Sequence, residues 1–457
     1  MSEKEKTGKK RRPMKSMSAP KMIVLVFLAI ILTGALLLML PFSTRSGESS
    51  GFLTALFTAT SATCVTGLSL VDTYTYWSGF GQAVILILIQ IGGLGFMTIV
   101  SVFFFVLRAK IGLRNRMLLS QSFGLDGVDG VVRMVRHVLI GTLLFEGVGA
   151  IVLTIRFSMD QPFLTALRWG VFHSVSAFCN AGFDITGKIA PGCSLIPYAG
   201  DVTVNVTIMM LIVIGGLGFV VWEDIWRNKR WKKLTVYSRL VLLISAGLIV
   251  GGAVAFGAME WNNPGTLGNL PTGKKLLVSA FQSVTTRTAG FTTIAQGNLT
   301  DSGKTLTSLL MLIGGSSGST AGGVKTVTMG IAVMGALATL RGKKQVTVFK
   351  RTVESNQITI AYSILLMMAA LPMFGAIYLS SVCHIGFLDA IYETISAIAT
   401  VGLSTGVTAL LNTVGKWILI AFMFFGRIGI MTIGIGFLLG DGEDGRYRYA
   451  PTKMLIG

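Results

Sequence analysis

The sequence predicts an all-α integral membrane protein built from four copies of one helix–loop–helix unit. The 457 residues are 52% hydrophobic and only 13% charged, with a mean hydropathy of +0.71, whereas soluble domains carry about 25% charged residues. Several apolar runs are long enough to cross a bilayer. A glycine motif also recurs four times along the chain.

The apolar runs begin after a basic segment, residues 1–20. The first run is too long for the apolar core of a typical secretory signal, and no small-residue cleavage site follows it, so we expect it to remain as a membrane span. The clear runs are 22–40, 80–107, 138–155, 202–222, 240–259, 358–382 and 417–439.

The positive charge is concentrated in a few segments between these runs. Of the 39 Lys and Arg residues, 28 lie in the stretches 1–21, 108–136, 223–239, 340–351 and 446–457. All five fall on one side of the membrane, which predicts a plasma-membrane protein with both termini in the cytoplasm. The stretches lack the interleaved aromatic residues that stack on bases, so nucleic acid is not an expected partner despite the net charge of +19.

The cysteines and histidines do not indicate a metal site or a disulfide framework. The 4 Cys and 3 His have no CxxC or HxxxH spacing.

Two motifs recur in fixed order. Segments 57–69, 172–184, 281–293 and 392–404 each run from an aromatic residue through Ser, Thr and Ala to a glycine, and the third is one residue shorter before its glycine. A second motif follows each one, at 91–96 (IGGLGF), 214–219 (IGGLGF), 313–318 (IGGSSG) and 425–430 (FGRIGI). The predicted repeats are 21–107, 137–222, 236–340 and 358–439, and residues 440–457 form a cytoplasmic C-terminus.

Each repeat is interpreted as a span, a short re-entrant pore helix with a glycine loop, and a second span, giving eight spans around a pseudo-fourfold pore. The stretches 52–63 and 388–399 are too short to cross a bilayer. Non-helical backbone survives at membrane depth only when it is buried in protein or lines a wet cavity.

The glycine loops are the candidate selectivity filter. A ring of backbone carbonyls can replace the hydration shell of K⁺, and glycine permits the backbone conformation that points them inward. The alternative is that these glycines simply end ordinary helices. The candidate filter residues are Cys64, Val65, Thr66, Gly67, Cys179, Asn180, Ala181, Gly182, Arg287, Thr288, Ala289, Gly290, Ala399, Thr400, Val401 and Gly402.

With these motifs the chain resembles the Trk/Ktr/HKT superfamily of potassium transport proteins, and most of all its bacterial Ktr-type membrane subunits. The resemblance covers residues 19–451. In that family a glycine in all four loops accompanies K⁺ selectivity, and a serine in the first loop marks sodium-transporting plant members, so Gly67 implies potassium. The resemblance also implies a homodimer on a ring of cytosolic nucleotide-binding (RCK-type) subunits, and an influence of Na⁺ on transport.

Residues 314–323, with five glycines, cannot hold a helix. They only superficially match a phosphate-binding loop, because Val324 separates Gly323 from Lys325 and an apolar run precedes the segment. The resemblance implies that this segment is an intramembrane gate. The candidate gate residues are Gly314, Gly315, Ser316, Ser317, Gly318, Ser319, Thr320, Ala321, Gly322, Gly323, Lys325 and Arg427.

Arg427 replaces the second glycine of the downstream motif. A cation inside an apolar run is costly and is functional by default; we expect a barrier in the pore or an anchor for the gate, and the alternative is snorkelling to the interface.

Other charged residues are weaker candidates. Arg287 is expected to point away from the pore and to pair with an acidic group such as Glu393. Glu146 is expected to have a structural role, pairing with a buried cation or capping a helical break, and the alternative is direct contact with the ion. Asp72, Asp184 and Asp201 lie near the predicted outer mouth, where they either raise the local cation concentration or are simply solvated.

The basic stretches 108–136, 223–239 and 340–357 are the expected docking surface for a cytosolic subunit, although membrane lipid would explain their charge equally well. The chief functional alternative to a potassium pore is an alternating-access carrier. An intramembrane enzyme is not expected, because no nucleophile–base or metal constellation stands out.

Overall fold

A computed structural model describes residues 19–95, 131–343 and 345–429 of the chain. The basic segment 1–18, most of the stretch 108–136, the second half of the run 80–107 and the C-terminal segment 440–457 lie outside the described residues.

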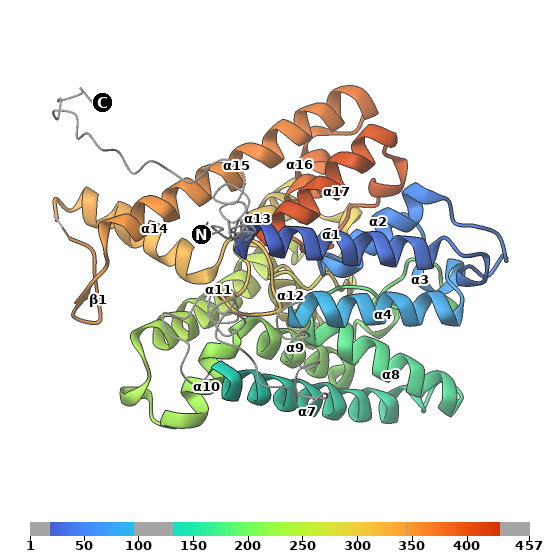
Figure 1. The fold of residues 1–457 in the computed structure, drawn as a ribbon, viewed down its shortest axis with the longest axis horizontal. Helices are drawn as coiled ribbons and strands as arrows, with labels where there is room; N and C mark the ends of the chain where they lie inside the picture. The colour runs from blue at the N-terminus through green and yellow to red at the C-terminus, as the bar shows by residue number, and fades with distance from the viewer. Residues whose placement is uncertain (1–18, 96–130, 344, 430–457) are drawn as a thin grey trace, which may run out of the picture.

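The described helices form four groups, each with a long helix, a short helix and a third helix in that order (Figure 1). The long helices are α1 (Ala19–Leu38), α7 (Val131–Phe157), α11 (Val236–Glu260) and α15 (Ser355–Cys383). The short helices are α2 (Phe52–Thr63), α8 (Phe163–Phe178), α12 (Thr272–Thr285) and α16 (Phe387–Ile398). The third helices are α4 (Gly79–Leu94), α9 (Val202–Leu217), α13 (Asp301–Leu312) and α17 (Thr413–Ile428).

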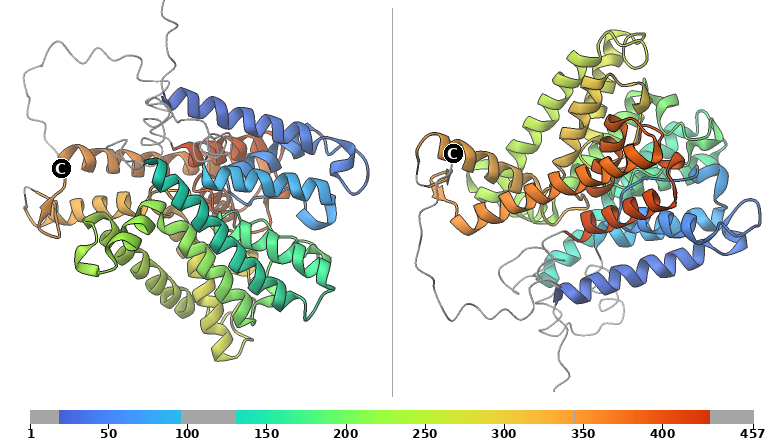
Figure 2. Two further views of the ribbon diagram at one scale, coloured as in Figure 1. Left: turned by 60° about the horizontal axis from the view of Figure 1, so that its bottom comes forward. Right: turned by 90° about the horizontal axis from the view of Figure 1, so that it is seen from above.

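Smaller elements complete the described fold. Helix α10 (Phe219–Asn228) follows α9, α14 (Thr326–Leu340) follows α13, and α3 (Thr73–Tyr76) lies between α2 and α4. Strands β1 (Thr347–Val348) and β2 (Arg351–Thr352) pair antiparallel, with Thr347 opposite Thr352. This hairpin and the end of α14 project beyond the other helices at one end of the molecule (Figures 1 and 2). The 3-10 turns are Pro41–Ser43, Thr186–Lys188, Ile196–Tyr198, Trp231–Lys233, Gln296–Asn298 and Thr408–Leu410.

The four long helices are apolar and long enough to cross a membrane. Helices α4, α9 and α17 are shorter than the apolar runs that they overlap, and α13 lies outside those runs. The run 202–222 differs from a single continuous span, because α9 ends at Leu217 and the chain bends by 91° into α10. Helices α4, α9 and α17 all end at the last glycine of the second motif, which has a positive φ: Gly95 (78°), Gly218 (94°) and Gly429 (93°). Glycine ends helices in this way because it adopts positive φ without strain.

All four third helices begin at a polar N-cap whose side chain accepts a hydrogen bond from the amide three residues later. Such a cap satisfies one of the free amides of the first turn. The caps are Ser78, Asp201, Thr300 and Asn412.

The groups close into a ring. Each third helix packs against the short helix of the next group: α4 on α8, α9 on α12, α13 on α16 and α17 on α2. The loops that follow the short helices also contact one another around this ring.

Candidate functional site

The four glycine loops (residues 64–67, 179–182, 287–290 and 399–402) leave the short helices in the same way. In three groups the amide of the residue before the glycine donates a hydrogen bond to a serine carbonyl five residues earlier. These bonds join Thr66 to Ser61 (2.8 Å), Ala181 to Ser176 (2.7 Å) and Val401 to Ser396 (2.8 Å). In the third group Ala289 bonds Thr285, four residues earlier, at 2.9 Å. The turn of the third loop is thus one residue shorter, which accommodates the residue missing from the third motif, and Gly290 follows the turn as the other three glycines do.

The backbone of each loop has an unusual sequence of dihedral angles. The residue two before each glycine is left-handed, with φ of 55° at Val65, 58° at Asn180, 68° at Thr288 and 51° at Thr400. The glycines also have positive φ, between 70° and 95°. Left-handed non-glycine residues are strained and persist only where surrounding structure holds them, typically at functional sites.

Each glycine lies against a carbonyl of a neighbouring loop. A methyl group added to Gly67 would lie 2.5 Å from the Ala181 carbonyl oxygen, on Gly182 2.7 Å from that of Ala289, on Gly290 2.5 Å from that of Val401, and on Gly402 2.0 Å from that of Thr66. The contacts run around all four loops and return to the first. Only glycine fits at these positions, because any side chain would push a neighbouring carbonyl away.

A hydroxyl near the end of each short helix supports its loop. Ser61 and Ser396 accept hydrogen bonds from the amides of Gly67 (3.1 Å) and Gly402 (3.0 Å). Ser176 and Thr285 donate to the carbonyls of Phe183 and Phe291, each at 2.7 Å. We did not predict these hydroxyls from the sequence, although they occupy one column of the repeated motif.

The second motif also has a structural role. A methyl group added to the first glycine of this motif would lie too close to a carbonyl oxygen at the end of the short helix. The distance is 1.9 Å for Gly92 and Thr63, 2.0 Å for Gly215 and Phe178, and 1.9 Å for Gly426 and Ile398. In these three groups the third helix therefore crosses the C-terminal end of its own short helix in backbone contact, whereas Gly314 of the third group faces the Gly322 carbonyl.

The glycine-serine loop (residues 314–323) interrupts the third group between α13 and α14. It is closed at its ends, where the Gly314 amide donates to Val324 (2.9 Å) and the Thr326 amide to Gly315 (3.0 Å). Ser316 and Thr320 are completely buried. The loop is therefore a packed part of the interior and not a surface connection.

The middle of this loop contacts other groups of the ring. The Ser316 amide donates to the Gly216 carbonyl (3.0 Å), and the Thr320 hydroxyl donates to the Phe178 carbonyl (3.1 Å). Gly322 packs so closely on the Thr400 hydroxyl that a methyl group would lie 1.9 Å from it. Lys325 folds back onto the Ala321 carbonyl at 2.8 Å. The loop thus lies directly beside the second and fourth glycine loops.

Arg427 joins this loop to the first group. Its guanidinium donates to the carbonyls of Thr320 and Gly92, and to that of Gly93 at 3.2 Å. Gly92 and Gly93 lie in the last turn of α4, where carbonyls have no helical partner and the helix dipole favours a cation. Arg427 therefore connects the glycine-serine loop to the end of α4.

Arg287 lies behind its loop and does not pair with Glu393, so that expected pair is wrong. Arg287 donates to the Gly314 carbonyl (3.3 Å) and to the Thr326 hydroxyl (3.2 Å). Glu393 instead accepts from Ser404 and from Thr408 (3.0 Å), behind the fourth glycine loop. The residues that the two side chains reach lie on different elements, which sequence spacing does not reveal.

Glu146 has neutral partners and no cation among the described residues. It accepts from Gln90 (3.2 Å) and lies 3.8 Å from the Cys179 thiol. The expectation of a paired cation is therefore wrong.

The three aspartates near the predicted outer mouth have structural partners. Asp72 accepts from the amides of Thr75 (2.7 Å) and Gly192 (2.8 Å), and Asp184 accepts from the Thr186 hydroxyl (2.9 Å). Asp201 caps α9 and pairs with Arg156.

All four cysteines are free thiols, and no group of three or more metal-ligating side chains occurs in the described part of the chain.

Comparison with known proteins gives one family. The family model described as TrkH, cation transport protein, matches residues 2–440. The potassium/sodium uptake protein NtpJ of Enterococcus hirae is 37% identical, covering 98% of this chain and 99% of its own. The Ktr system potassium uptake protein B of Bacillus subtilis is 39% identical, covering 96% of each chain. The crystal structure of the potassium transporter TrkH from Vibrio parahaemolyticus has the same fold, with a TM-score of 0.72 at 17% identity over 93% of this chain and 86% of that one. Because the family model matches nearly the whole chain, the chain belongs to the TrkH family of cation transport proteins.

Proposed function

We propose that this membrane protein takes up potassium ions through a pore formed by its four glycine loops. The family consists of ion transporters and not enzymes, and relatives that align over nearly the full chain are named for potassium or potassium/sodium uptake. The observation that carries the proposal is the closed series of contacts between each glycine and a neighbouring carbonyl. Four equivalent loops around one axis provide the carbonyl ring that K⁺ needs in place of water.

The filter is assigned to the sixteen residues of the four glycine loops. In each loop two positive φ angles are separated by one residue that lacks a positive φ. Such alternation turns successive carbonyls to one side, whereas an extended strand points them to opposite sides. The short helices act as pore helices, and their C-terminal ends aim negative dipole charge at the ring. A cation is stabilised there without any acidic side chain.

The gate is assigned to residues 314–323, Lys325 and Arg427. The loop lies against the Phe178 carbonyl and the Thr400 hydroxyl, at the inner ends of the second and fourth pore helices, and Arg427 holds it to α4. In this position it obstructs an ion leaving the ring. Transport therefore requires the loop to move away from these partners.

Two features are assigned from the charge pattern and the family. Positive charge on one side of the membrane supports cytoplasmic termini, eight spans in four repeats and a plasma-membrane location. The name "Ktr system" of the relatives supports a multi-subunit assembly; we propose a homodimer on an RCK-type cytosolic ring that binds nucleotide. The basic stretches 108–136, 223–239 and 340–357 are the docking surface.

The proposal is tested by expressing the chain in a bacterial strain that lacks potassium uptake. Growth at low potassium is expected to be restored, with rubidium uptake that competes with potassium. Protein that is present in the membrane but restores no growth would contradict it. Uptake measured with and without sodium tests whether Na⁺ activates transport, a question raised by the name of the relative NtpJ. If rubidium on the opposite (trans) side of the membrane strongly stimulated rubidium uptake, an alternating-access carrier would be favoured over a pore.

A further inference from the structure

Arg287 touches both ends of the glycine-serine loop. One guanidinium nitrogen, Nη2, lies 3.3 Å from the Gly314 carbonyl oxygen, where the loop begins, and 3.2 Å from the Thr326 hydroxyl, just after the loop ends. The Thr326 hydroxyl in turn donates to the same Gly314 carbonyl at 3.1 Å. We call these two contact residues, Gly314 and Thr326, the loop base.

The loop base and the rest of the loop are held differently. The base bonds to Arg287 and to itself, all within the third group. Residues 316–321, the loop tip, bond across to the second group, at Phe178, Gly215, Gly216 and Phe219, and to Arg427 of the fourth. From the rest of the third group the tip accepts only side-chain hydrogen bonds among the described residues, from Tyr237 and Lys325. The tip can therefore leave its partners while the base stays in place.

Arg287 also belongs to the third glycine loop. It precedes left-handed Thr288 (φ 68°) and lies three residues before Gly290. Thr288 packs on the loop base as well, since a methyl group on Gly314 would lie 3.2 Å from its Cγ2 atom. Two adjacent side chains of this glycine loop, Arg287 and Thr288, are thus in direct contact with the loop base.

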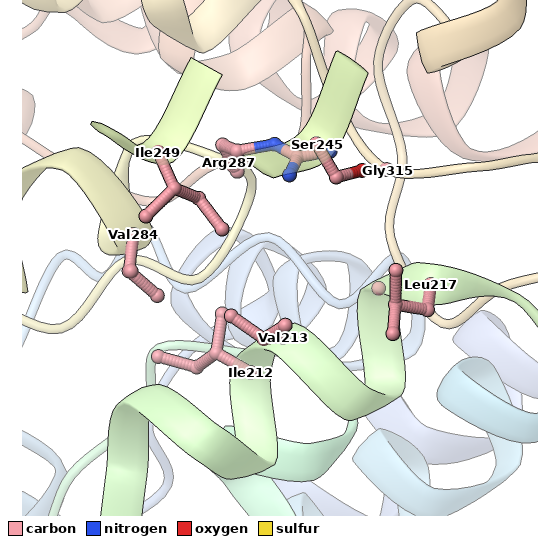
Figure 3. A pocket seen from close by; sticks show the side chains of 9 residues that line it. Ile212, Val213, Leu217, Ser245, Ile249, Val284, Arg287 and Gly315 are labelled. Atoms are coloured by element: carbon pink, nitrogen blue, oxygen red, sulfur yellow. The ribbon is translucent and has the colours of Figure 1, made fainter. Parts of the chain in front are cut away.

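The guanidinium is buried, and its orientation depends on these contacts. Arg287 is 9% exposed, and none of the ion pairs found among the described residues includes it. Arg287 also lines a small cavity between α9, α11 and α12, together with Ser245, Ile249 and Gly315 (Figure 3). Within the described part of the chain, the Arg287 Nε and the Ser245 hydroxyl have no hydrogen-bond partner, and the cavity has room for about one water molecule. Among the residues that the structure describes, only the loop base accepts hydrogen bonds from the guanidinium directly.

We propose that Arg287 couples the third glycine loop to the glycine-serine loop, so that the filter and the gate share one fixed hinge. This inference rests on the proposed filter and gate. A charged hydrogen bond in a buried site is strong and directional. Because the same side chain holds the hinge and is part of the filter loop, its loss loosens the gate and also distorts the ring of carbonyls. Release of the tip alone opens the gate without changing the filter.

The test compares Arg287→Met and Thr326→Val with Arg427→Met in purified full-length protein reconstituted in vesicles, with rubidium flux and the K⁺/Na⁺ selectivity ratio as readouts. We expect Arg287→Met and Thr326→Val to raise basal flux and to lower selectivity, for Arg287→Met by about tenfold. Arg427→Met is expected to raise flux with parental selectivity. The double variant of Arg287 and Thr326 is expected to show the same flux and selectivity as Arg287→Met, because both changes remove the same interaction.

Arg168→Met is the matched control. Arg168 lies on α8 and donates to Gln82 (3.4 Å), away from the loop base, so flux and selectivity are expected to stay parental. Parental selectivity in Arg287→Met or Thr326→Val, or additive effects in the double variant, would overturn the coupling. If Arg287→Met is not recovered as folded protein, Thr326→Val alone decides. Deletion of residues 316–321 tests the gate itself: unchanged flux would refute the proposed gate, whereas raised flux with parental selectivity in Arg287→Met would refute only the coupling.

Discussion

The contact between Gly402 and Thr66 allows the proposed filter to be tested with one methyl group. Gly402 has a φ of 90°, and its added Cβ atom would lie 2.0 Å from the Thr66 carbonyl oxygen. Ordinary contact begins at 3.4 Å, so this carbonyl would have to move by about 1.4 Å, the difference between the two distances. Gly402→Ala is expected to abolish selective K⁺ uptake, because a shift of this size removes the carbonyl from its place in the ring.

The chain offers a close control for the backbone strain of this substitution. Gly406 lies four residues away with a φ of 97°, and nothing lies within 4 Å of its added Cβ atom. Both alanine variants therefore bear a similar cost of about 1–2 kcal/mol for a left-handed residue, and only Gly402→Ala displaces a neighbouring loop. The difference between the two variants isolates the effect of the ring.

The assay is growth at low potassium together with rubidium uptake and its inhibition by sodium, at matched amounts of protein in the membrane. We expect Gly406→Ala to transport as the parent does. If Gly402→Ala transports with parental rate and selectivity, the four loops do not form the filter. If Gly406→Ala fails equally, strain at positive φ explains the loss and the contact with Thr66 is not its cause.

Three further predictions follow from the described contacts. Gly67→Ser is expected to lower K⁺/Na⁺ selectivity, since its Cβ atom would lie 2.5 Å from the Ala181 carbonyl oxygen; uptake of sodium by the variant and the parent measures this, and equal selectivity would count against the first loop as part of the filter. Arg427→Met removes charged hydrogen bonds to Thr320, Gly92 and Gly93, each worth about 1.5–3 kcal/mol, so basal flux should rise at least about tenfold; an unchanged or lower flux in folded protein would show that this contact does not hold the gate closed. Thr300→Ala removes the N-cap of α13, where the hydroxyl accepts from Gly303 at 3.0 Å, and should lower the free energy of unfolding by about 1 kcal/mol with unchanged selectivity; thermal unfolding in detergent checks the first part, and a shift in selectivity would mean that α13 acts on the filter.

The short helices were accessible from sequence. The stretch 52–63 coincides with α2, and the stretch 388–399 lies within one residue of α16. Length was sufficient here, because both stretches are too short to cross a bilayer and a glycine follows each. The N-caps Ser78, Asp201 and Asn412 could also have been found, since each lies shortly before an apolar run, whereas Thr300 precedes the polar residues 301–305.

The ends of the third helices were not accessible in the same way. The runs 202–222 and 417–439 continue as apolar sequence beyond Leu217 and Ile428, where the helices end. Hydropathy does not change at these points. The bend between α9 and α10 lies at Gly218, and α17 ends at Gly429; both glycines have a positive φ. A glycine within an apolar run is equally compatible with a continuous helix.

The sequence by itself determined the membrane class, the fourfold repetition and the positions of the four glycines, because hydropathy and local backbone freedom are properties of short segments. Only the tertiary structure decided which groups meet. It brought Gly402 against Thr66 to close the ring, turned Arg287 away from Glu393 and onto Gly314 and Thr326, and bound Arg427 to Thr320 and Gly92. These contacts join residues as far as 336 positions apart, as between Thr66 and Gly402, and depend on how four helix groups pack around one axis. No local pattern in one chain encodes that packing.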